Sequence, residues 1–137
     1  MPKASASLDL PVSAEDVWKL VGGFQALPDW LPMIVESLPQ EGGHVRHLRT
    51  ADGTIIVERL HSYDAEARTY SYSIVEGPFP VTEYLATLKV EATGDKTSKV
   101  TWGGSFTPVG VSDAEVETLF KGVYEGGLAA LKAHYQA

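Results

Sequence analysis

The sequence predicts an α+β protein in which a curved antiparallel sheet of about seven strands wraps around a long C-terminal helix. Three observations predict this class. Matching helix-start signals stand near the two ends of the chain, apolar and polar residues alternate with a period of two between them, and turn residues recur between the alternating segments. Because 137 residues suffice for one ordinary core and not for two, we expect a single domain over residues 1–137.

The N-terminal elements are expected to be one strand and two short helices. Alternation predicts the strand at Lys3–Leu10. Ser13 can then cap a helix with an acidic first turn, and the glycines at 22–23 end that helix early. A second short helix is expected over residues 29–33, after the interruption at Pro28.

The middle of the chain is typical of an antiparallel meander. Turn signals fall at residues 41–43, 52–53, 64–67, 77–78 and 94–95. The clearest alternation covers residues 68–75, 84–90 and 99–106, where aromatic and aliphatic side chains share one face and small or charged side chains share the other. Together with the first strand, about six such segments complete the sheet.

The last helix is predicted from residue 113 to residue 134. Ser112 supplies its cap, and its apolar residues recur at spacings of three and four. At ~1.5 Å per residue the helix is about 33 Å long, enough to cross a small sheet. The glycines at 126–127 each cost about 1 kcal/mol relative to alanine. Either close approach to the sheet or room for a ligand requires them.

Composition excludes several classes of partner. The formal net charge of -7, without a cluster of Lys or Arg, makes nucleic acid and anionic membrane surfaces poor partners. No stretch of about 18 apolar residues is present, and the N-terminus lacks the apolar core of a signal peptide, so we expect a cytoplasmic protein without membrane insertion. The chain has no cysteine, and His44 and His47 fall on opposite faces of a strand, so no metal site is predicted. No P-loop or dinucleotide fingerprint indicates a cofactor.

Several phrases of the sequence resemble the START-related helix-grip superfamily. They are the run VERL at 57–60, Asp64, the run YSYSIVEGP at 70–78, the run PDW at 28–30 and the run VTW at 100–102. The resemblance covers essentially the whole chain and is closest to the polyketide cyclase/dehydrase-like branch, with the birch-pollen allergen and the plant abscisic-acid receptors as other members. It implies a helix-grip fold around a cavity, whereas ligands differ widely between members.

The resemblance also implies a set of pocket residues. Glu58 resembles the inward acidic residue of the fourth strand, which contacts polar ligand groups in the receptor branch. The resemblance further assigns as pocket-facing the positions Tyr72, Ile74, Tyr84, Val123 and Gly127. Two departures set this chain apart from the receptors. No pocket lysine stands near residues 34–36, and the gating loops are replaced by residues 51–53 and 77–80, so plant hormone sensing is not implied.

The partner of Glu58 depends on the register of one hairpin. If residues 51–53 form a three-residue loop, Thr50 faces Thr54 and Arg46 lies opposite Glu58; a two-residue turn at 52–53 places His47 there instead. Paired with Arg46, the carboxylate stays ionised and binds ligand donors, whereas paired with His47 it orients an acid/base imidazole. We favour Arg46. A solvated Glu58 is the competing interpretation.

Aromatic residues with polar groups complete the candidate site. Trp30 and Trp102 join the two tyrosines in suiting a pocket that holds a ring and fixes its orientation, although ordinary core packing explains such residues equally well. The candidate ligand-binding residues are therefore Trp30, Arg46, Glu58, Tyr72, Ile74, Tyr84, Trp102, Val123 and Gly127. No residue is assigned as catalytic, and Glu58 is the single candidate.

The leading hypothesis is binding or transport of a small hydrophobic molecule, such as a lipid, polyketide or aromatic metabolite, between the sheet and the last helix. A second hypothesis is a cyclase or dehydratase in which Glu58 is the acid/base group and Tyr72 or Tyr84 donates to a developing enolate. A third is a protein-interaction module that uses the strand near residues 75–81. We expect a monomer or a weak homodimer.

Overall fold

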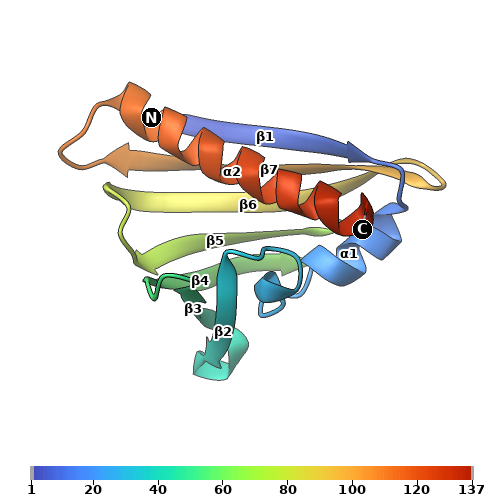
Figure 1. The fold of residues 1–137 in the computed structure, drawn as a ribbon, viewed down its shortest axis with the longest axis horizontal. Coiled ribbons are helices and arrows are strands. Elements are labelled where there is room, and N and C mark those ends of the chain that lie inside the picture. Colours follow the sequence, from blue (N-terminus) through green and yellow to red (C-terminus); the bar gives the residue numbers. More distant parts are fainter. Residues whose placement is uncertain (1, 137) are drawn as a thin grey trace.

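The computed structural model describes residues 2–136 and shows one curved sheet with a long helix lying across it (Figure 1). Its helices are α1 (Ala14–Val21) and α2 (Asp113–Gln136), with 3₁₀ helices at Leu27–Asp29 and Glu41–Gly43. Its strands are β1 (Lys3–Leu10), β2 (Ile34–Gln40), β3 (Val45–Thr50), β4 (Ile55–Asp64), β5 (Thr69–Glu76), β6 (Val81–Gly94) and β7 (Thr97–Pro108).

The strands form a seven-stranded antiparallel sheet in the order β1-β7-β6-β5-β4-β3-β2. Each strand from β2 to β7 pairs with its neighbour in sequence, as expected of a meander, and β1 returns to pair with β7. α2 lies over the β1 and β7 side of the sheet, while β3 and β4 curve away below it (Figure 1). The predicted fold class, a curved sheet around a long C-terminal helix, is confirmed.

Both predicted helix starts are present. Ser13 caps α1 and its side-chain oxygen accepts a hydrogen bond from the backbone N–H of Asp16 at 3.2 Å. Ser112 does the same for Glu115 at the start of α2, at 3.1 Å. Acidic residues in the first turn of each helix add favourable interactions with the helix dipole. α2 continues two residues beyond the predicted end, to Gln136.

The second short helix differs from its prediction. Expected over residues 29–33, it is instead a 3₁₀ helix at Leu27–Asp29, with Pro28 in its first turn. Proline is well suited to that place, because the first N–H groups of a helix have no partner within it. The helix ends when Trp30 donates its backbone N–H to Leu27 at 3.3 Å, and the chain enters β2 at Ile34.

The inner face of the sheet and α2 share one core. On β6 the buried residues alternate as predicted, and on β7 Val100, Trp102 and Phe106 are buried in the same way. Gly127 allows close approach of α2 to the sheet, because a Cβ atom there would overlap the ring of Trp102. Close packing against the sheet therefore explains this glycine. No helix within residues 2–136 is long and apolar enough to cross a membrane.

Candidate ligand-binding cavity

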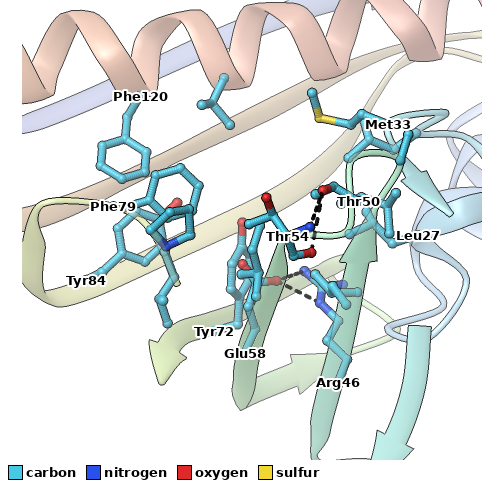
Figure 2. A pocket seen from close by; sticks show the side chains of 18 of the residues that line it. Leu27, Met33, Arg46, Thr50, Thr54, Glu58, Tyr72, Phe79, Tyr84 and Phe120 are labelled. Carbon is cyan, nitrogen blue, oxygen red and sulfur yellow. Dashed lines mark hydrogen bonds and ion pairs between the residues drawn. The ribbon is translucent and has the colours of Figure 1, made fainter. Parts of the chain in front are cut away.

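A cavity of about 490 Å³ lies between α2 and the half of the sheet formed by β3, β4 and β5 (Figure 2). This volume lies within the range of small-molecule sites. Its wall is mainly apolar. The exposed lining residues lie before β2 and in the β3–β4 turn and the β5–β6 loop, and they mark the mouth of the cavity. The lining residues are Leu27, Leu31, Met33, Ile34, Arg46, Leu48, Thr50, Ala51, Asp52, Thr54, Ile56, Glu58, Tyr72, Ile74, Pro78, Phe79, Tyr84, Trp102, Phe120 and Val123.

The inner end of the cavity contains a buried ion pair between β3 and β4. The hairpin register places Arg46 directly opposite Glu58, and Thr50 donates its backbone N–H to Thr54 at 2.9 Å across the three-residue turn. Arg46 Nε donates to Glu58 Oε1 at 2.8 Å, and Arg46 Nη2 lies 2.7 Å from the same oxygen (Figure 2). The predicted register is confirmed, and the alternative with His47 is excluded.

The guanidinium of Arg46 is held on every side. Its Nη1 donates to the backbone carbonyl of Phe24 at 2.8 Å, and its Cζ lies 4.2 Å from the centre of the Phe24 ring and 4.9 Å from that of Tyr72. These are cation–π distances, which suit the weakly hydrated guanidinium. The Arg46 side chain is only 1% exposed. Burial opposes its charge, but Glu58 and the surrounding tyrosines outweigh this effect and raise the pKa of Arg46.

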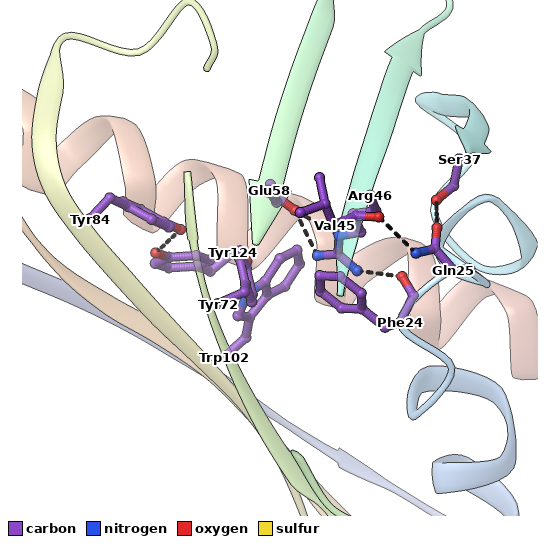
Figure 3. Close-up of polar contacts among 10 residues, drawn as sticks. All are labelled: Phe24, Gln25, Ser37, Val45, Arg46, Glu58, Tyr72, Tyr84, Trp102 and Tyr124. Atoms are coloured by element: carbon purple, nitrogen blue, oxygen red, sulfur yellow. Dashed lines mark hydrogen bonds and ion pairs between the residues drawn. The ribbon is translucent and has the colours of Figure 1, made fainter. Parts of the chain in front are cut away.

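The loop that carries the Phe24 carbonyl is fixed to the sheet by its neighbour Gln25. The side-chain amide of Gln25 donates to the carbonyl of Val45 at 3.2 Å and accepts a hydrogen bond from the Ser37 hydroxyl at 2.8 Å (Figure 3). The loop after α1 is thus tied to both β2 and β3. This tie sets the position of the acceptor that Arg46 uses.

Glu58 presents its second oxygen to the cavity. Both contacts from Arg46 reach Oε1, and within residues 2–136 no hydrogen bond reaches Oε2. Within the described residues, two side-chain polar atoms are both fully buried and without a hydrogen-bond partner, and they are Trp30 Nε1 and Ser98 Oγ. Glu58 Oε2 is not one of them, so this unpaired oxygen keeps some accessible surface. Burial raises the pKa of Glu58, and the adjacent guanidinium counteracts that rise. The two contacts from the charged guanidinium to Oε1 favour the carboxylate form, in which Oε2 can accept a hydrogen bond from a ligand.

Two further pairs of aromatic side chains place hydroxyl groups at the cavity. Trp102 Nε1 donates to the hydroxyl oxygen of Tyr72 at 2.9 Å, and the hydroxyls of Tyr84 and Tyr124 are hydrogen-bonded at 2.5 Å (Figure 3). Burial raises the pKa of Tyr72, Tyr84 and Tyr124. These phenols therefore remain protonated and can donate hydrogen bonds.

A β-bulge sets the direction of Tyr84. The pairing between β6 and β7 shifts between Thr82 and Leu85, and Glu83 there adopts a left-handed backbone conformation with φ 53°. Bulges of this kind redirect side chains at the rims of sheets. Tyr84 consequently faces the cavity and is buried, whereas Leu85 is exposed on the other face.

Seven of the nine candidate residues line the cavity: Arg46, Glu58, Tyr72, Ile74, Tyr84, Trp102 and Val123. Trp30 and Gly127 do not. Trp30 is buried and packs edge-on against Trp102 with ring centres 5.8 Å apart, and Gly127 contacts the ring of Trp102 from α2. Both residues thus contact Trp102, which itself lines the cavity. Their role as ligand-binding residues stays a prediction.

Other lining residues were not predicted from the sequence. One group, Leu27, Leu31 and Ile34, recurs at spacings of four and three, which is a detectable apolar signal. Leu48 and Ile56 share the inner faces of β3 and β4 with Arg46 and Glu58. On these strands the period was hidden, because a buried ion pair occupies positions that otherwise hold apolar residues.

The curved sheet, the helix across it and the apolar cavity between them are the features that the helix-grip resemblance implied. The sequence profile of a family described as "Polyketide cyclase / dehydrase and lipid transport" matches residues 1–136. The chain belongs to this family. The resemblance inferred from the sequence is therefore confirmed.

Solved structures share this fold. The protein XoxI from Bacillus cereus is 49% identical, with a TM-score of 0.95, and the match covers 99% of this chain and 96% of that one. A protein from Bacillus thuringiensis is 48% identical, with a TM-score of 0.96 and coverage of 98% and 99%. The di-domain aromatase/cyclase BexL of the BE-7585A biosynthetic pathway shares the fold, with 22% identity, a TM-score of 0.87 and coverage of 99% of this chain and 47% of BexL. No match was found among curated proteins.

Proposed function

We propose that this protein binds a small hydrophobic molecule in the cavity between the sheet and α2, as a carrier or sensor. The observation that supports this most directly is the cavity itself, about 490 Å³ in volume and mainly apolar, with polar groups concentrated at its inner end and mouth. Burial of an apolar ligand there contributes about 25 cal/mol per Å² before the costs of association. The polar groups then fix the orientation of the ligand.

The mouth of the cavity suits ligand exchange. Met33 is 59% exposed although it lines the cavity, and Phe79 of the β5–β6 loop packs against Phe120 of α2 with ring centres 5.2 Å apart. An exposed methionine is a flexible apolar surface that adapts to ligands of different shape. Movement of the loop that carries Phe79 would open a path without disturbing the sheet.

Native mass spectrometry of the protein purified from its own host tests this proposal. We expect a stoichiometric apolar compound, which solvent extraction then identifies. Tyr84→Ala should lose this compound, whereas Tyr135→Ala, at the far end of α2 and outside the lining, should retain it. A mass without ligand, combined with failure to take up a hydrophobic dye, would contradict the proposal and favour a protein-interaction role.

Catalysis by the same cavity is the second candidate. It is supported by the family description, which names polyketide cyclase and dehydrase, and by the free oxygen of Glu58 beside Tyr72. In this proposal Glu58 Oε2 takes a proton from a carbon next to a substrate carbonyl, and a tyrosine hydroxyl donates a hydrogen bond to the enolate oxygen that forms.

Steady-state kinetics with a polyketide-like diketone distinguish the two functions. A cyclase predicts turnover that increases with pH as Glu58 ionises and that disappears in Glu58→Gln. Tight binding without turnover, in wild type and variant alike, would support the carrier or sensor function alone.

A further inference from the structure

The chemistry of the cavity's polar groups limits which ligands can bind there. Arg46 is the only cation among the lining residues of the described chain, and it offers little to a ligand. Its Nε and Nη2 contact Glu58, its Nη1 contacts the Phe24 carbonyl, and two aromatic rings cover its faces. With a side chain 1% exposed, the guanidinium is already neutralised and enclosed.

The charge that reaches the cavity is negative. The Glu58 side chain is 10% exposed, and its Oε2 receives no hydrogen bond within the described chain. A second carboxylate, Asp52, stands at the mouth, where it accepts hydrogen bonds from Thr50 Oγ1 and the backbone N–H of Thr54. These bonds lower the pKa of Asp52. An anionic ligand would thus meet carboxylates at both ends, with no free cation among the lining residues of the described chain.

A donor stands beside the acceptor. The Tyr72 hydroxyl oxygen accepts the hydrogen bond from Trp102, and within residues 2–136 its own hydrogen has no acceptor, so it remains available to a ligand. Tyr72 and Glu58 both line the cavity, from neighbouring strands. The inner end therefore offers one acceptor and one donor. A hydroxyl group, which donates one hydrogen bond and accepts others, matches this pair, whereas a protonated amine has no lone pair for Tyr72.

We propose that the ligand is a neutral molecule with an apolar body and a hydroxyl group, phenolic or alcoholic, at its polar end. The cavity then discriminates against carboxylates of the same shape. This inference rests on the proposed function and specifies the ligand class of the same site. The hydroxyl donates to Glu58 Oε2 and accepts from Tyr72. A carboxylate would instead place its charge against Glu58 and leave that acceptor unpaired.

Displacement of a neutral fluorescent dye, N-phenylnaphthylamine, provides the test. Naphthol and naphthoate share one ring system and differ in the polar group, so they are compared as competitors at neutral pH. We expect naphthol to displace the dye at a concentration about tenfold lower or more, because a charge-assisted hydrogen bond is formed in one case and lost in the other. Equal or better displacement by naphthoate would overturn the inference while leaving the proposed function intact.

Variants assign the discrimination to Glu58. Glu58→Gln should shrink the difference between the two competitors to about threefold or less. Glu91→Gln removes an equal charge from the exposed outer part of β6 and should preserve it. If Glu58→Gln does not fold, the double variant Arg46→Met, Glu58→Leu is tested in its place, because it also removes the Glu58 charge. A difference that survives removal of the Glu58 charge would contradict the inference. Absence of saturable dye binding by the wild type would instead overturn the proposed function.

Discussion

Replacing Arg46 by methionine should strongly destabilise the protein, because it leaves Glu58 buried without its partner. The side chains of the pair are 1% and 10% exposed, and Arg46 makes contacts of 2.7 and 2.8 Å to one carboxylate oxygen. Breaking such a buried pair typically costs about 3–5 kcal/mol. The Phe24 carbonyl also loses the 2.8 Å hydrogen bond from Arg46, which adds about 1 kcal/mol. We therefore expect the free energy of unfolding to fall by about 4 kcal/mol or more.

Urea unfolding followed by circular dichroism measures this change in a double-mutant cycle. The double variant Arg46→Met, Glu58→Leu removes both charges and should lie within about 2 kcal/mol of wild type, since apolar residues often replace a buried pair without loss. The control is Arg59→Met, which breaks the exposed contact of 2.9 Å with Glu41 and should cost less than about 1 kcal/mol. Additive effects of Arg46→Met and Glu58→Leu would refute the reasoning.

The stability of the single variant Arg46→Met has a predicted pH dependence. Burial raises the pKa of Glu58, and in Arg46→Met no guanidinium counteracts it. The folded state then binds the proton more tightly than the unfolded state. Its free energy of unfolding should therefore fall as pH rises through the folded-state pKa, and part of the lost stability should return on mild acidification. Stability that is independent of pH in this range would show that the carboxylate is solvated in the variant.

Four further changes have defined outcomes. Gly127→Ala should lower the free energy of unfolding by about 1–3 kcal/mol because its Cβ overlaps Trp102, whereas Gly126→Ala meets no neighbouring atom and should raise it by about 0.5–1 kcal/mol; thermal unfolding of the two variants compares them directly. Tyr84→Phe should cost about 1–2 kcal/mol in urea unfolding, because it leaves the Tyr124 hydroxyl without its partner, and an unchanged midpoint would contradict this role. The free energy of unfolding of the wild type should fall above about pH 10, because burial keeps four tyrosines protonated in the folded state while those of the unfolded chain ionise. These tyrosines are Tyr70, Tyr72, Tyr84 and Tyr124. A free energy of unfolding that does not change above this pH would contradict their burial.

Local sequence signals predicted the elements that local chemistry determines. The caps at Ser13 and Ser112 form as expected, since the donors they satisfy lie three residues away in sequence. The three-residue turn after Thr50 was chosen correctly and fixed the pairing of Arg46 with Glu58. A single turn type determines the register of a whole hairpin, so this prediction extended from one loop to the inner end of the cavity.

Features that depend on packing between distant elements were predicted less well. Trp30 and Gly127 belong to inward-facing positions, but both pack against the ring of Trp102 and are outside the cavity lining. Periodicity indicates which way a side chain points and not what lies between it and a cavity. The β6 bulge at Glu83, which directs Tyr84, has no glycine to signal it. The short helix begins at Leu27, two residues before its predicted start at residue 29. The reason is that Pro28 occupies the first turn of this helix and does not precede it.

The most direct test of the central claim fills the cavity from α2. Val123 lines the cavity, whereas Leu119 lies one turn earlier on the same helix, is 39% exposed and is outside the lining. Titration with N-phenylnaphthylamine should show saturable binding of about one dye per chain in wild type and in Leu119→Trp, and a loss of affinity of about tenfold or more in Val123→Trp, with unchanged circular dichroism. Equal binding by Val123→Trp and wild type would show that the dye, and by extension any hydrophobic ligand, binds elsewhere.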